Sequence, residues 1–415
     1  MDAGTLIIGA SQAGLQLAVS LRELGDTGAV TLVGAEAHPP YQRPPLSKEY
    51  LAGTADGNTL AFRAPSFYAE QGIDLICGER VDQLWLRADG SGAGSARTAG
   101  GREFSFDRLA LTTGAAPRRL AVPGVHLEGI CYLRDLDDAR RLRDHLAEAR
   151  RVVVVGGGFV GLEAAAVARA RGLEVTVVEA LERLIARAVA PVVSTFYKEA
   201  HARRGTTVVL NTGVVGFRGE GGRVTTVVLT DGAELPADLV MVGVGVVPCT
   251  ELAEQIGLEC DGGIVVDRYA RTSNPAVVAA GDCTVLPHPV TGEGRVRLES
   301  VNNAVTQAAT AAATLMGKLE AAPNVPWFWS NQGDLRLQIA GLAAGFDDYV
   351  VRGEPDSERF SVLYYRDGRL LAADAVNVPG DYMVVRKALT QGATIPADRA
   401  ADVSTPLRQL LLAAA

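Results

Sequence analysis

The sequence predicts an α/β protein that contains two strand–turn–helix–strand units and a C-terminal α/β domain. In the first unit, the apolar run Leu6–Ile8 precedes a glycine-containing turn, a helical stretch over Leu15–Leu24 and the apolar run Val30–Val33. The same order of elements begins again at Arg151, so the unit is duplicated within one chain. Short apolar runs are typical of buried parallel strands, and a length of 415 residues suits two or three domains.

The second copy carries a complete nucleotide-binding pattern. Arg151–Val155 is followed by the letters GGGFVG, a helical stretch over Leu162–Arg171 and a strand over Glu174–Glu179. The glycines of the G-x-G-x-x-G pattern are Gly156, Gly158 and Gly161. The first allows a tight turn, the second lets a pyrophosphate approach the backbone, and the third lets the helix pack on the strand. The N-terminus of the helix supplies N–H groups for the phosphates, so this unit predicts a dinucleotide site.

Glu179 predicts which dinucleotide the second unit prefers. It ends its strand 23 residues after Gly156. This is close to the ~20 residues expected for the acid that binds a ribose 2′-hydroxyl. A carboxylate there repels the 2′-phosphate of NADP, so we expect NADH/NAD to be the preferred nucleotide.

The first copy carries a variant of the pattern. In the letters GASQAG, Gly9 and Gly14 fill the outer positions, and Ser11 stands where the middle glycine is expected. Taken alone, this turn is equally consistent with a nucleotide site and with an ordinary connection between a strand and a helix. After the second strand, Ala35 precedes Glu36, and Glu36 is the acid available for a ribose.

The remaining segments complete the predicted domains. Leu109–Gly114 is a strand that ends on a glycine, and Leu239–Val247 is a single strand that closes the second unit. The strand Val277–Asp282 ends in Gly-Asp, whose carboxylate suits either a cofactor hydroxyl or solvent. From about Pro323, aromatic strand-like segments and a helix near Tyr382–Leu389 predict the third domain.

Two charged residues stand out beside these patterns. The segment Pro40–Leu51 predicts a rigid loop rather than a helix, because prolines fix its backbone. It contains Lys48, one of four lysines in the chain, which by default is an exposed charge. Glu163 lies two residues after Gly161, on the first turn of the predicted helix, where the helix dipole favours a carboxylate. The alternative for Glu163 is a position facing a bound nicotinamide.

Composition excludes several classes of function. A net charge of −8 and a pI near 5.3 argue against nucleic-acid binding, which requires basic surface. No segment has the pattern of a signal peptide or a membrane span, so we expect a cytoplasmic protein that is not anchored in a membrane. The five cysteines lie far apart without a CxxC or CxxxxC pair, which predicts reduced, structural thiols. The five histidines show no metal-binding spacing.

The chain resembles the FAD-dependent, NADH-linked ferredoxin reductases of bacterial oxygenase systems, which are putidaredoxin-reductase-like members of the glutathione-reductase-like flavoprotein class. The resemblance spans nearly the whole chain and is carried in order by GASQAG, YQRPPLSKEYL, LTTGAAPRRL, GGGFVGLEAA, VGVGVVPCTELAE, TSNPAVVAAGDC, LESVNNAVTQAA and PWFWSNQ. RPPLSK and PWFWS are specific to this branch. The sequence departs from the family at Ser11, at Ala35 in place of an acid, and at Asn331 in place of Asp.

The resemblance implies two Rossmann-type domains and a C-terminal domain. FAD would bind a split domain formed by residues 1–120 and 246–322. NADH would bind the inserted domain, residues 121–245, and residues 323–415 would form the C-terminal α/β domain.

The resemblance also implies catalytic residues, which are Lys48, Glu163 and Trp329. Lys48 and Glu163 would meet beside the flavin and nicotinamide rings, positioning them and tuning their charge. Trp327 or Trp329 would cover the far side of the ring system, where the cluster of a partner approaches.

The implied cofactor contacts are spread over both units. Asp282 would hold the ribityl chain, and Val301 would reach the flavin through its backbone. The complete set is Gly9, Ser11, Ala13, Gly14, Glu36, Arg43, Lys48, Val81, Thr113, Gly114, Arg134, Gly156, Gly158, Gly161, Glu179, Gly245, Asp282, Val301 and Trp329.

The missing cysteine pair predicts how electrons leave the protein. Flavin accepts the two electrons of a hydride and releases them singly, so without a thiol relay they should pass directly to a protein acceptor. We expect NADH and FAD as cofactors and a [2Fe–2S] ferredoxin as partner, supplying a cytochrome P450 or a ring-hydroxylating oxygenase. The alternatives are a rubredoxin reductase or NADH oxidase-like flavoprotein, and a non-catalytic NADH-sensing protein resembling apoptosis-inducing factor. A monomer and a homodimer are both open.

Overall fold

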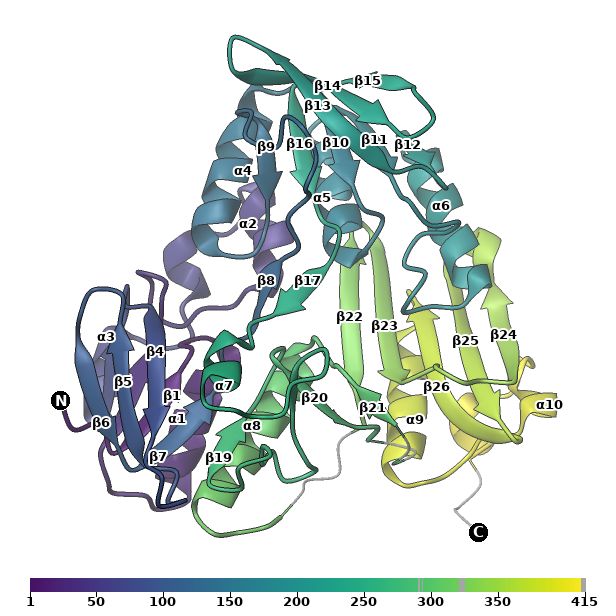
Figure 1. The fold of residues 1–415 in the computed structure, drawn as a ribbon. Helices are drawn as coiled ribbons and strands as arrows, with labels where there is room; N and C mark the ends of the chain where they lie inside the picture. The colour runs from purple at the N-terminus through teal and green to yellow at the C-terminus, as the bar shows by residue number, and fades with distance from the viewer. Residues whose placement is uncertain (290–291, 293, 321–324, 412–415) are drawn as a thin grey trace. The chain divides into compact units, whose positions relative to one another are not determined.

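The structure, a computed structural model, describes residues 1–289, 292, 294–320 and 325–411. It has the α/β fold predicted from the sequence (Figure 1). Contacts divide the chain into two compact units. The first comprises Met1–Gln42, Leu60–Ala116 and Val247–Pro326, and the second comprises Arg43–Thr59, Pro117–Val246 and Trp327–Ala415. The domain boundaries expected from the sequence stay predictions, and the one between residues 322 and 323 lies outside the described residues.

The first unit is built on a parallel five-stranded sheet with the strand order β19-β7-β1-β2-β3. Its strands are β1 (Thr5–Ile8), β2 (Val30–Val33), β3 (Ile73–Ile76), β7 (Arg108–Leu111) and β19 (Val277–Ala279). The central strand β1 leads through the first glycine loop into helix α1 (Gln12–Glu23). The N-terminus of α1 therefore lies at the carboxyl edge of the sheet, which is where open α/β sheets bind ligands.

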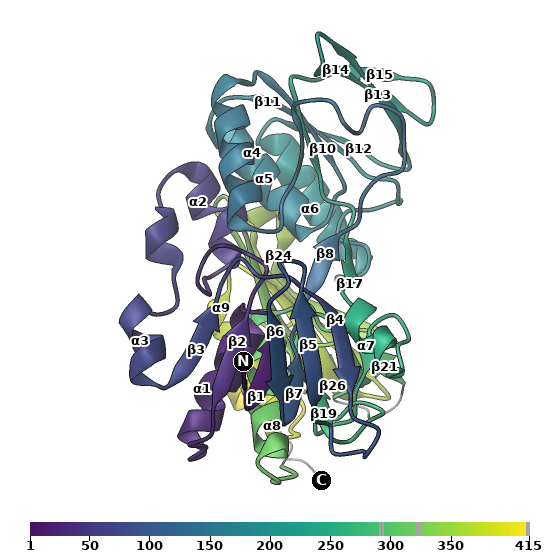
Figure 2. The ribbon, with the colours of Figure 1, turned by 60° about the vertical axis from the view of Figure 1, so that its left-hand side comes forward.

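The two faces of this sheet pack against different layers, because successive residues of a strand point to opposite sides (Figure 2). Ile7 and Leu32 pack against the helical layer, which includes α1 and α8 (Val301–Leu315). Ile8 and Leu111 pack against an antiparallel sheet. The elements that complete this unit are β4 (Val81–Leu86), β5 (Gly94–Thr98), β6 (Glu103–Phe106), α3 (Pro65–Glu70), α7 (Glu251–Gln255), β18 (Ile264–Val265), β20 (Thr284–Pro287) and β21 (Arg295–Val296).

The second unit repeats this architecture. Its parallel sheet has the order β12-β11-β10-β16-β9, formed by β9 (Ile130–Tyr132), β10 (Arg151–Val155), β11 (Glu174–Val178), β12 (Thr206–Val209) and β16 (Leu239–Val242). Val152 and Val154 pack against helices, whereas Val153 and Val155 pack against an antiparallel sheet. The covering elements are α4 (Leu136–Glu148), α5 (Phe159–Ala170), α6 (Pro191–Arg203), β13 (Val214–Glu220), β14 (Arg223–Leu229) and β15 (Glu234–Pro236).

An antiparallel sheet completes the second unit, with the order β22-β23-β26-β25-β24. Leu337 and Phe360 on one of its faces share a core with Phe196 of α6. On the other face, Leu363 packs with Val385 of α9. The elements of this region are β22 (Trp327–Gln332), β23 (Leu335–Gly341), β24 (Asp348–Glu354), η3 (Pro355–Ser357), β25 (Arg359–Arg366), β26 (Arg369–Val376), α9 (Pro379–Thr390), α10 (Ala397–Ala400) and η4 (Leu407–Gln409). A further pair of short strands, β8 (Ala115–Pro117) and β17 (Val246–Pro248), forms where the chain passes between the units.

Two helices begin earlier than predicted. Helix α1 begins at Gln12 rather than Leu15, and α5 begins at Phe159 rather than Leu162. The last glycine of each pattern therefore lies inside the first turn of its helix, although a glycine in the sequence indicates a turn before the helix. The prediction of one strand over Leu239–Val247 is wrong, because the chain turns between β16 and β17 at Gly245, which has a φ of +95°.

The prediction of a non-helical loop over Pro40–Leu51 is also wrong in part. Pro44–Ser47 forms the short 3₁₀ helix η1, and Glu49–Ala52 forms the short helix α2. Proline is well suited to the first turn of a helix, because the N–H that it lacks would have no helical partner there. A further 3₁₀ turn, η2, spans Gly57–Leu60.

Candidate functional site

The first glycine loop is closed by backbone contacts that exclude side chains. Gly9 has a φ of +117°, and a Cβ there would lie 2.1 Å from the Thr112 carbonyl oxygen. A Cβ at Gly14 would lie 2.0 Å from the Gly9 carbonyl oxygen. Ser11, between them, precedes α1 with a φ of −130°, a conformation that any residue adopts.

The second glycine loop has the same two tight positions. Gly156 has a φ of +108°, and a Cβ there would lie 2.3 Å from the Gly243 carbonyl oxygen. A Cβ at Gly161 would lie 2.4 Å from the Gly156 carbonyl oxygen. At Gly158, an added Cβ would meet no described atom within 4 Å. The chain itself therefore needs the outer glycines, and the middle position faces open space at a helix N-terminus, which fits a bound pyrophosphate.

The acids that follow the second strand of each unit differ in their partners. Glu179 Oε2 accepts a hydrogen bond from the Gly157 N–H at 2.7 Å, and its Oε1 accepts one from the Leu181 N–H at 2.8 Å. The carboxylate thus lies against the second loop, where the sequence predicts a ribose acid. In the first unit, Glu36 accepts a hydrogen bond from the hydroxyl of Tyr41.

The Gly281–Asp282 turn lies beside the first loop. A Cβ at Gly281 would lie 3.1 Å from the Cβ of Ala13, so the structure brings together two predicted contact regions. Strand β19 ends at Ala279, three residues before Asp282, so the predicted strand end is wrong and the acid belongs to the turn. Val301 is the first residue of α8.

Buried polar groups at the start of α8 fit a polar ligand. Gln307 Oε1 accepts hydrogen bonds from the Gly281 N–H at 2.8 Å and from Thr284 Oγ1 at 2.9 Å. Among the described residues, Gln307 Nε2, Asn302 Oδ1 and Asn303 Oδ1 are buried without a hydrogen-bond partner. Such atoms are costly unless a ligand or water satisfies them, so this end of the first unit fits a flavin cofactor.

Other predicted contacts occupy turns at sheet edges. The Thr113 hydroxyl donates to the Cys249 carbonyl at 2.7 Å, and the Cys249 N–H donates to the Gly114 carbonyl at 2.9 Å. Strand β7 ends at Leu111, before the predicted end at Gly114. The Val81 side chain is buried in the core, and Val81 pairs with Thr98 of the neighbouring strand, so its contact with a cofactor stays a prediction.

Lys48 and Glu163 form a buried ion pair in the second unit. The distance between Lys48 Nζ and Glu163 Oε2 is 2.7 Å, and the two side chains are 11% and 4% exposed. Ser47 also donates to Glu163 Oε2, and Lys48 Nζ donates to the Pro44 carbonyl at 2.8 Å. The structure therefore brings these two predicted residues together, while their place beside the rings of the cofactors stays a prediction.

The expectation that Glu163 lies on the first helical turn is wrong. Because α5 begins at Phe159, Glu163 lies on the second turn, where the helix dipole gives little support to a carboxylate. Its charge is instead compensated by Lys48 and by hydroxyl donors. A buried carboxylate without such partners would be strongly destabilising.

Arg43 and Arg134 also lie together in the second unit. Arg43 Nη1 donates to the Arg134 carbonyl oxygen at 2.7 Å. The Arg134 N–H donates to Asp138 Oδ2 at 3.0 Å, next to the start of α4. At the end of the same unit, Gly245 accepts a hydrogen bond from the Arg118 N–H at 2.9 Å.

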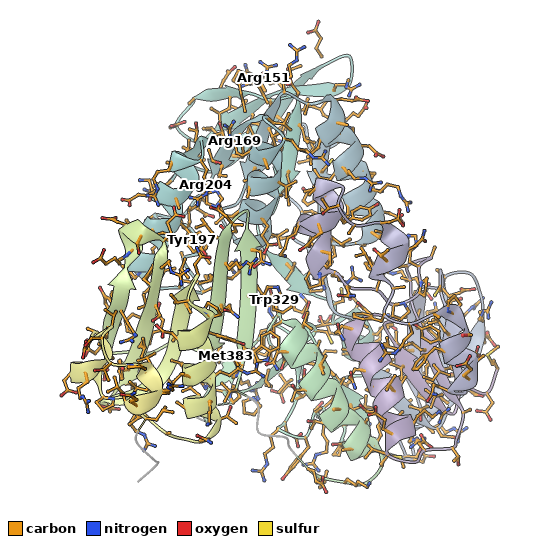
Figure 3. All side chains as sticks on the ribbon, turned by 180° about the vertical axis from the view of Figure 1, so that it is seen from behind. Arg151, Arg169, Tyr197, Arg204, Trp329 and Met383 are labelled. Carbon is orange, nitrogen blue, oxygen red and sulfur yellow. The ribbon has the colours of Figure 1, made fainter. Side chains whose placement is uncertain are left out.

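Strand β22 presents different chemistry on its two faces. Trp327 and Trp329 stack with ring centroids 5.5 Å apart, and the guanidinium of Arg386 lies 5.0 Å from the Trp327 ring. Trp329 is labelled in Figure 3. Because side chains alternate along a strand, Ser330 and Gln332 point to the opposite face, where both are fully buried. The Ser330 hydroxyl donates to Glu163 Oε1 at 2.7 Å.

Sequence analysis did not identify His201, which lies behind Ser330 and Gln332. Gln332 Nε2 donates to Ser330 Oγ at 3.3 Å, and Gln332 Oε1 lies 2.8 Å from His201 Nε2. Burial lowers the pKa of His201 and is the largest influence on it. The hydrogen bond to Gln332 acts in the opposite direction, and the positive charge of Arg204 lowers the pKa further. His201 lies 131 residues from Gln332 in the sequence, so no local pattern marks the contact.

Two of the thiols are poorly suited to redox chemistry. All five cysteines are free, as predicted from their spacing. Burial raises the pKa of Cys131 and of Cys283 to about 11, which keeps both thiols protonated near neutral pH. No cluster of metal-ligating side chains and no helix long and apolar enough to cross a membrane occurs among the described residues.

Comparisons with known proteins agree with this geometry. The profile of the family described as pyridine nucleotide-disulphide oxidoreductase matches residues 4–308, and the profile described as reductase C-terminal matches residues 327–411. Rhodocoxin reductase of Rhodococcus erythropolis is 45% identical over 403 residues, which cover 97% of this chain and 93% of the relative.

Two solved structures are similar over nearly their whole length. The ferredoxin reductase for the CYP199A2 system from Rhodopseudomonas palustris is 42% identical with a TM-score of 0.93, covering 98% of this chain and 99% of that one. Putidaredoxin reductase in its covalent complex with putidaredoxin is 38% identical with a TM-score of 0.93, covering 98% of each chain. The family resemblance and the fold class predicted from the sequence are thereby confirmed.

Proposed function

Because the chain belongs to the pyridine nucleotide-disulphide oxidoreductase family, we propose that it is an FAD-containing, NADH-dependent ferredoxin reductase. Its electrons would pass to a [2Fe–2S] ferredoxin in the cytoplasm, which would supply a cytochrome P450 or a ring-hydroxylating oxygenase. The observation that carries this proposal is the buried Lys48–Glu163 pair, whose Glu163 lies on α5, the helix that follows a complete dinucleotide loop.

The residues of each unit suit different parts of the reaction. The first loop and the Gly281–Asp282 turn would hold FAD, and the second loop with Glu179 would hold NADH. When bound, FAD supplies the ability to accept a hydride and to release its electrons one at a time. Lys48 supplies a positive charge, and its ammonium group is held in place by hydrogen bonds to Glu163 and to the Pro44 carbonyl. A charge that is already held in place stabilises the transition state of hydride transfer, because the protein does not have to reorganise as charge develops there.

The acceptor is inferred from the protein's thiols and from its relatives. Since the thiols are free, and those of Cys131 and Cys283 are held protonated, a disulfide acceptor within the chain is disfavoured. One similar structure is a reductase joined to putidaredoxin, which supports a ferredoxin as the partner. Trp329 would lie at the exit of the electrons, as the family resemblance implies.

The test is an anaerobic reduction of the purified protein. We expect yellow protein with one FAD per chain, whose absorption is bleached by NADH much faster than by NADPH. Steady-state rates would then be compared with a [2Fe–2S] ferredoxin, with rubredoxin and with oxygen as acceptors. Fast turnover with the ferredoxin supports the proposal. Faster turnover with rubredoxin or oxygen would favour the other reductase or oxidase functions, and a long-lived reduced complex without turnover would favour an NADH sensor.

A further inference from the structure

A continuous row of buried side chains extends from the Lys48–Glu163 pair into the C-terminal sheet. Glu163 Oε1 accepts from Ser330 Oγ at 2.7 Å, Ser330 Oγ accepts from Gln332 Nε2 at 3.3 Å, and Gln332 Oε1 lies 2.8 Å from His201 Nε2. The side chains of Glu163, Ser330, Gln332 and His201 belong to residues that are at most 3% exposed. We call this row the Glu163–His201 relay.

Every hydrogen bond of the relay is donated toward Glu163. Gln332 uses its NH₂ group toward Ser330, so its oxygen faces His201, and His201 Nε2 must carry the proton. The Ser330 proton is then free to point at Glu163. Each donor thus points toward the carboxylate, and hydrogen bonds that run in one direction polarise and strengthen one another.

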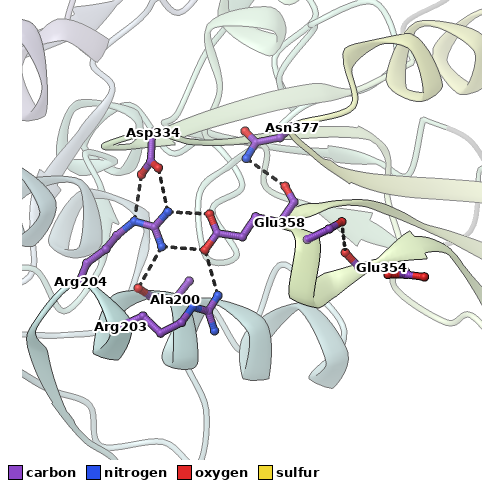
Figure 4. A network of polar contacts seen from close by, with 8 residues as sticks. Ala200, Arg203, Arg204, Asp334, Glu354, Glu358 and Asn377 are labelled. Carbon is purple, nitrogen blue, oxygen red and sulfur yellow. Dashed lines mark hydrogen bonds and ion pairs between the residues drawn. The ribbon is translucent and has the colours of Figure 1, made fainter.

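Near the far end of the relay, Arg204 at the C-terminus of α6 forms a network of ion pairs (Figure 4). The Arg204 guanidinium donates to Asp334 Oδ2 at 2.9 Å and to Glu358 Oε2 at 2.6 Å, which links α6 to the C-terminal sheet. These bonds lower the pKa of both carboxylic acids. His201 lies three residues before Arg204, so the network fixes the helical turn that carries His201.

We propose that Ser330 and Gln332 are positioning residues that orient the Glu163 carboxylate, and through it Lys48, from the C-terminal sheet. This inference rests on the proposed function, in which Lys48 and Glu163 act beside the cofactor rings. Without Ser330, Glu163 Oε1 loses its donor inside a buried site, and the carboxylate is able to turn away from its bond to Lys48. The C-terminal domain therefore contributes to hydride transfer as well as to contact with a partner.

The kinetic test compares variants on the two faces of β22. Ser330→Ala and Gln332→Met interrupt the relay with little change in volume, and Asn331→Ala is the matched control on the opposite face. With FAD bound, we expect the first two variants to slow flavin reduction at saturating NADH by about 5- to 30-fold, with little change in the Kd of NADH. Asn331→Ala should stay within about 2-fold of the wild type. Wild-type reduction rates in folded Ser330→Ala and Gln332→Met would overturn the proposal, and so would an equal loss in Asn331→Ala.

A second measurement is independent of turnover. In ¹⁵N-histidine-labelled protein, the resonance of His201 is assigned with His201→Gln. We expect a neutral ring protonated at Nε2, whose proton exchanges with water at least about 10-fold faster in Gln332→Met. A ring protonated only at Nδ1 would overturn the relay even if NADH reduces the flavin normally. If NADH fails to reduce the wild-type flavin but His201 carries the Nε2 proton, the proposed function fails while the relay geometry stands.

Discussion

The two glycine loops of this chain have the same backbone architecture but differ at one position. In both, the outer glycines are required by the chain, because an added Cβ would lie 2.0 to 2.4 Å from a backbone oxygen. The middle position is Ser11 in the first loop and Gly158 in the second. A Cβ at Gly158 would meet no described atom within 4 Å, so the chain itself tolerates a side chain there.

This difference shows that the three-glycine pattern serves two separate requirements, the folding of the loop and the binding of the nucleotide. The outer glycines allow the loop to fold between strand and helix, and they are needed whether or not a nucleotide is bound. The middle glycine matters to the ligand, because a side chain there competes with phosphate for space. Ser11 is therefore compatible with the fold, and we expect it to influence the affinity for the nucleotide.

The largest effect is expected from the outer glycines. In Gly9→Ala and Gly156→Ala, the new methyl group would lie 2.1 and 2.3 Å from a backbone oxygen, at φ angles of +117° and +108°. Relieving such overlap costs about 3 kcal/mol or more, which should lower the Tm of both variants by at least ~5 °C and reduce the bound FAD in Gly9→Ala, whose loop would hold that cofactor. Thermal denaturation followed by flavin fluorescence measures both effects. Gly158→Ala is the control, and a loss of stability as large as that of Gly156→Ala would remove the distinction between outer and middle positions.

A second effect is expected from the acid at the second loop. Glu179→Gln keeps an oxygen that is able to accept from the Gly157 N–H but removes the charge that would repel a 2′-phosphate. We expect the preference for NADH over NADPH, measured as a ratio of kcat/KM values, to fall about 10-fold. Glu174→Gln, an exposed acid at the start of the same strand, should leave the ratio unchanged. An unaltered ratio in Glu179→Gln would show that another residue selects the nucleotide.

The parts of the site that sequence predicts are those with local constraints. The glycine loops were predictable because backbone contacts within a short segment restrict the residue type, as at Gly9 and Gly156. The Lys48–Glu163 pair spans 115 residues, and the sequence indicated it only through resemblance to a family. Neither a local sequence pattern nor the family resemblance indicated the contact between His201 and Gln332, because the two residues meet only after α6 packs on the C-terminal sheet. Helix starts were predicted too late because the last glycine of each pattern, Gly14 or Gly161, indicates a loop in the sequence but lies within the first turn of α1 or α5.

A smaller effect is expected from placing the serine of the first loop at the middle position of the second loop. In Gly158→Ser, the φ of −82° and ψ of 178° are allowed for serine, so the Tm should stay within about 2 °C of the wild type. The new side chain would occupy space expected for the pyrophosphate of NADH, and we expect the Kd of NADH to rise about 3- to 10-fold. The FAD content, which depends on the other loop, should not change. Tighter binding of NADH would show that serine at the middle position is a ligand in both loops.

The smallest effect is expected from the reverse change, Ser11→Gly. Removing the Cβ and hydroxyl gives the phosphate more room but takes away a hydroxyl that is able to donate to it, and these changes oppose each other. Since Ser11 has a φ of −130° and a ψ of −152°, glycine is not needed for the backbone, and its greater freedom in the unfolded chain costs about 0.5–1 kcal/mol of stability. We expect the Kd of FAD, titrated into the apoprotein, to stay the same or to fall by up to about 3-fold. A clear loss of FAD would instead make Ser11 an essential phosphate ligand, and the two loops would then differ in mechanism as well as in sequence.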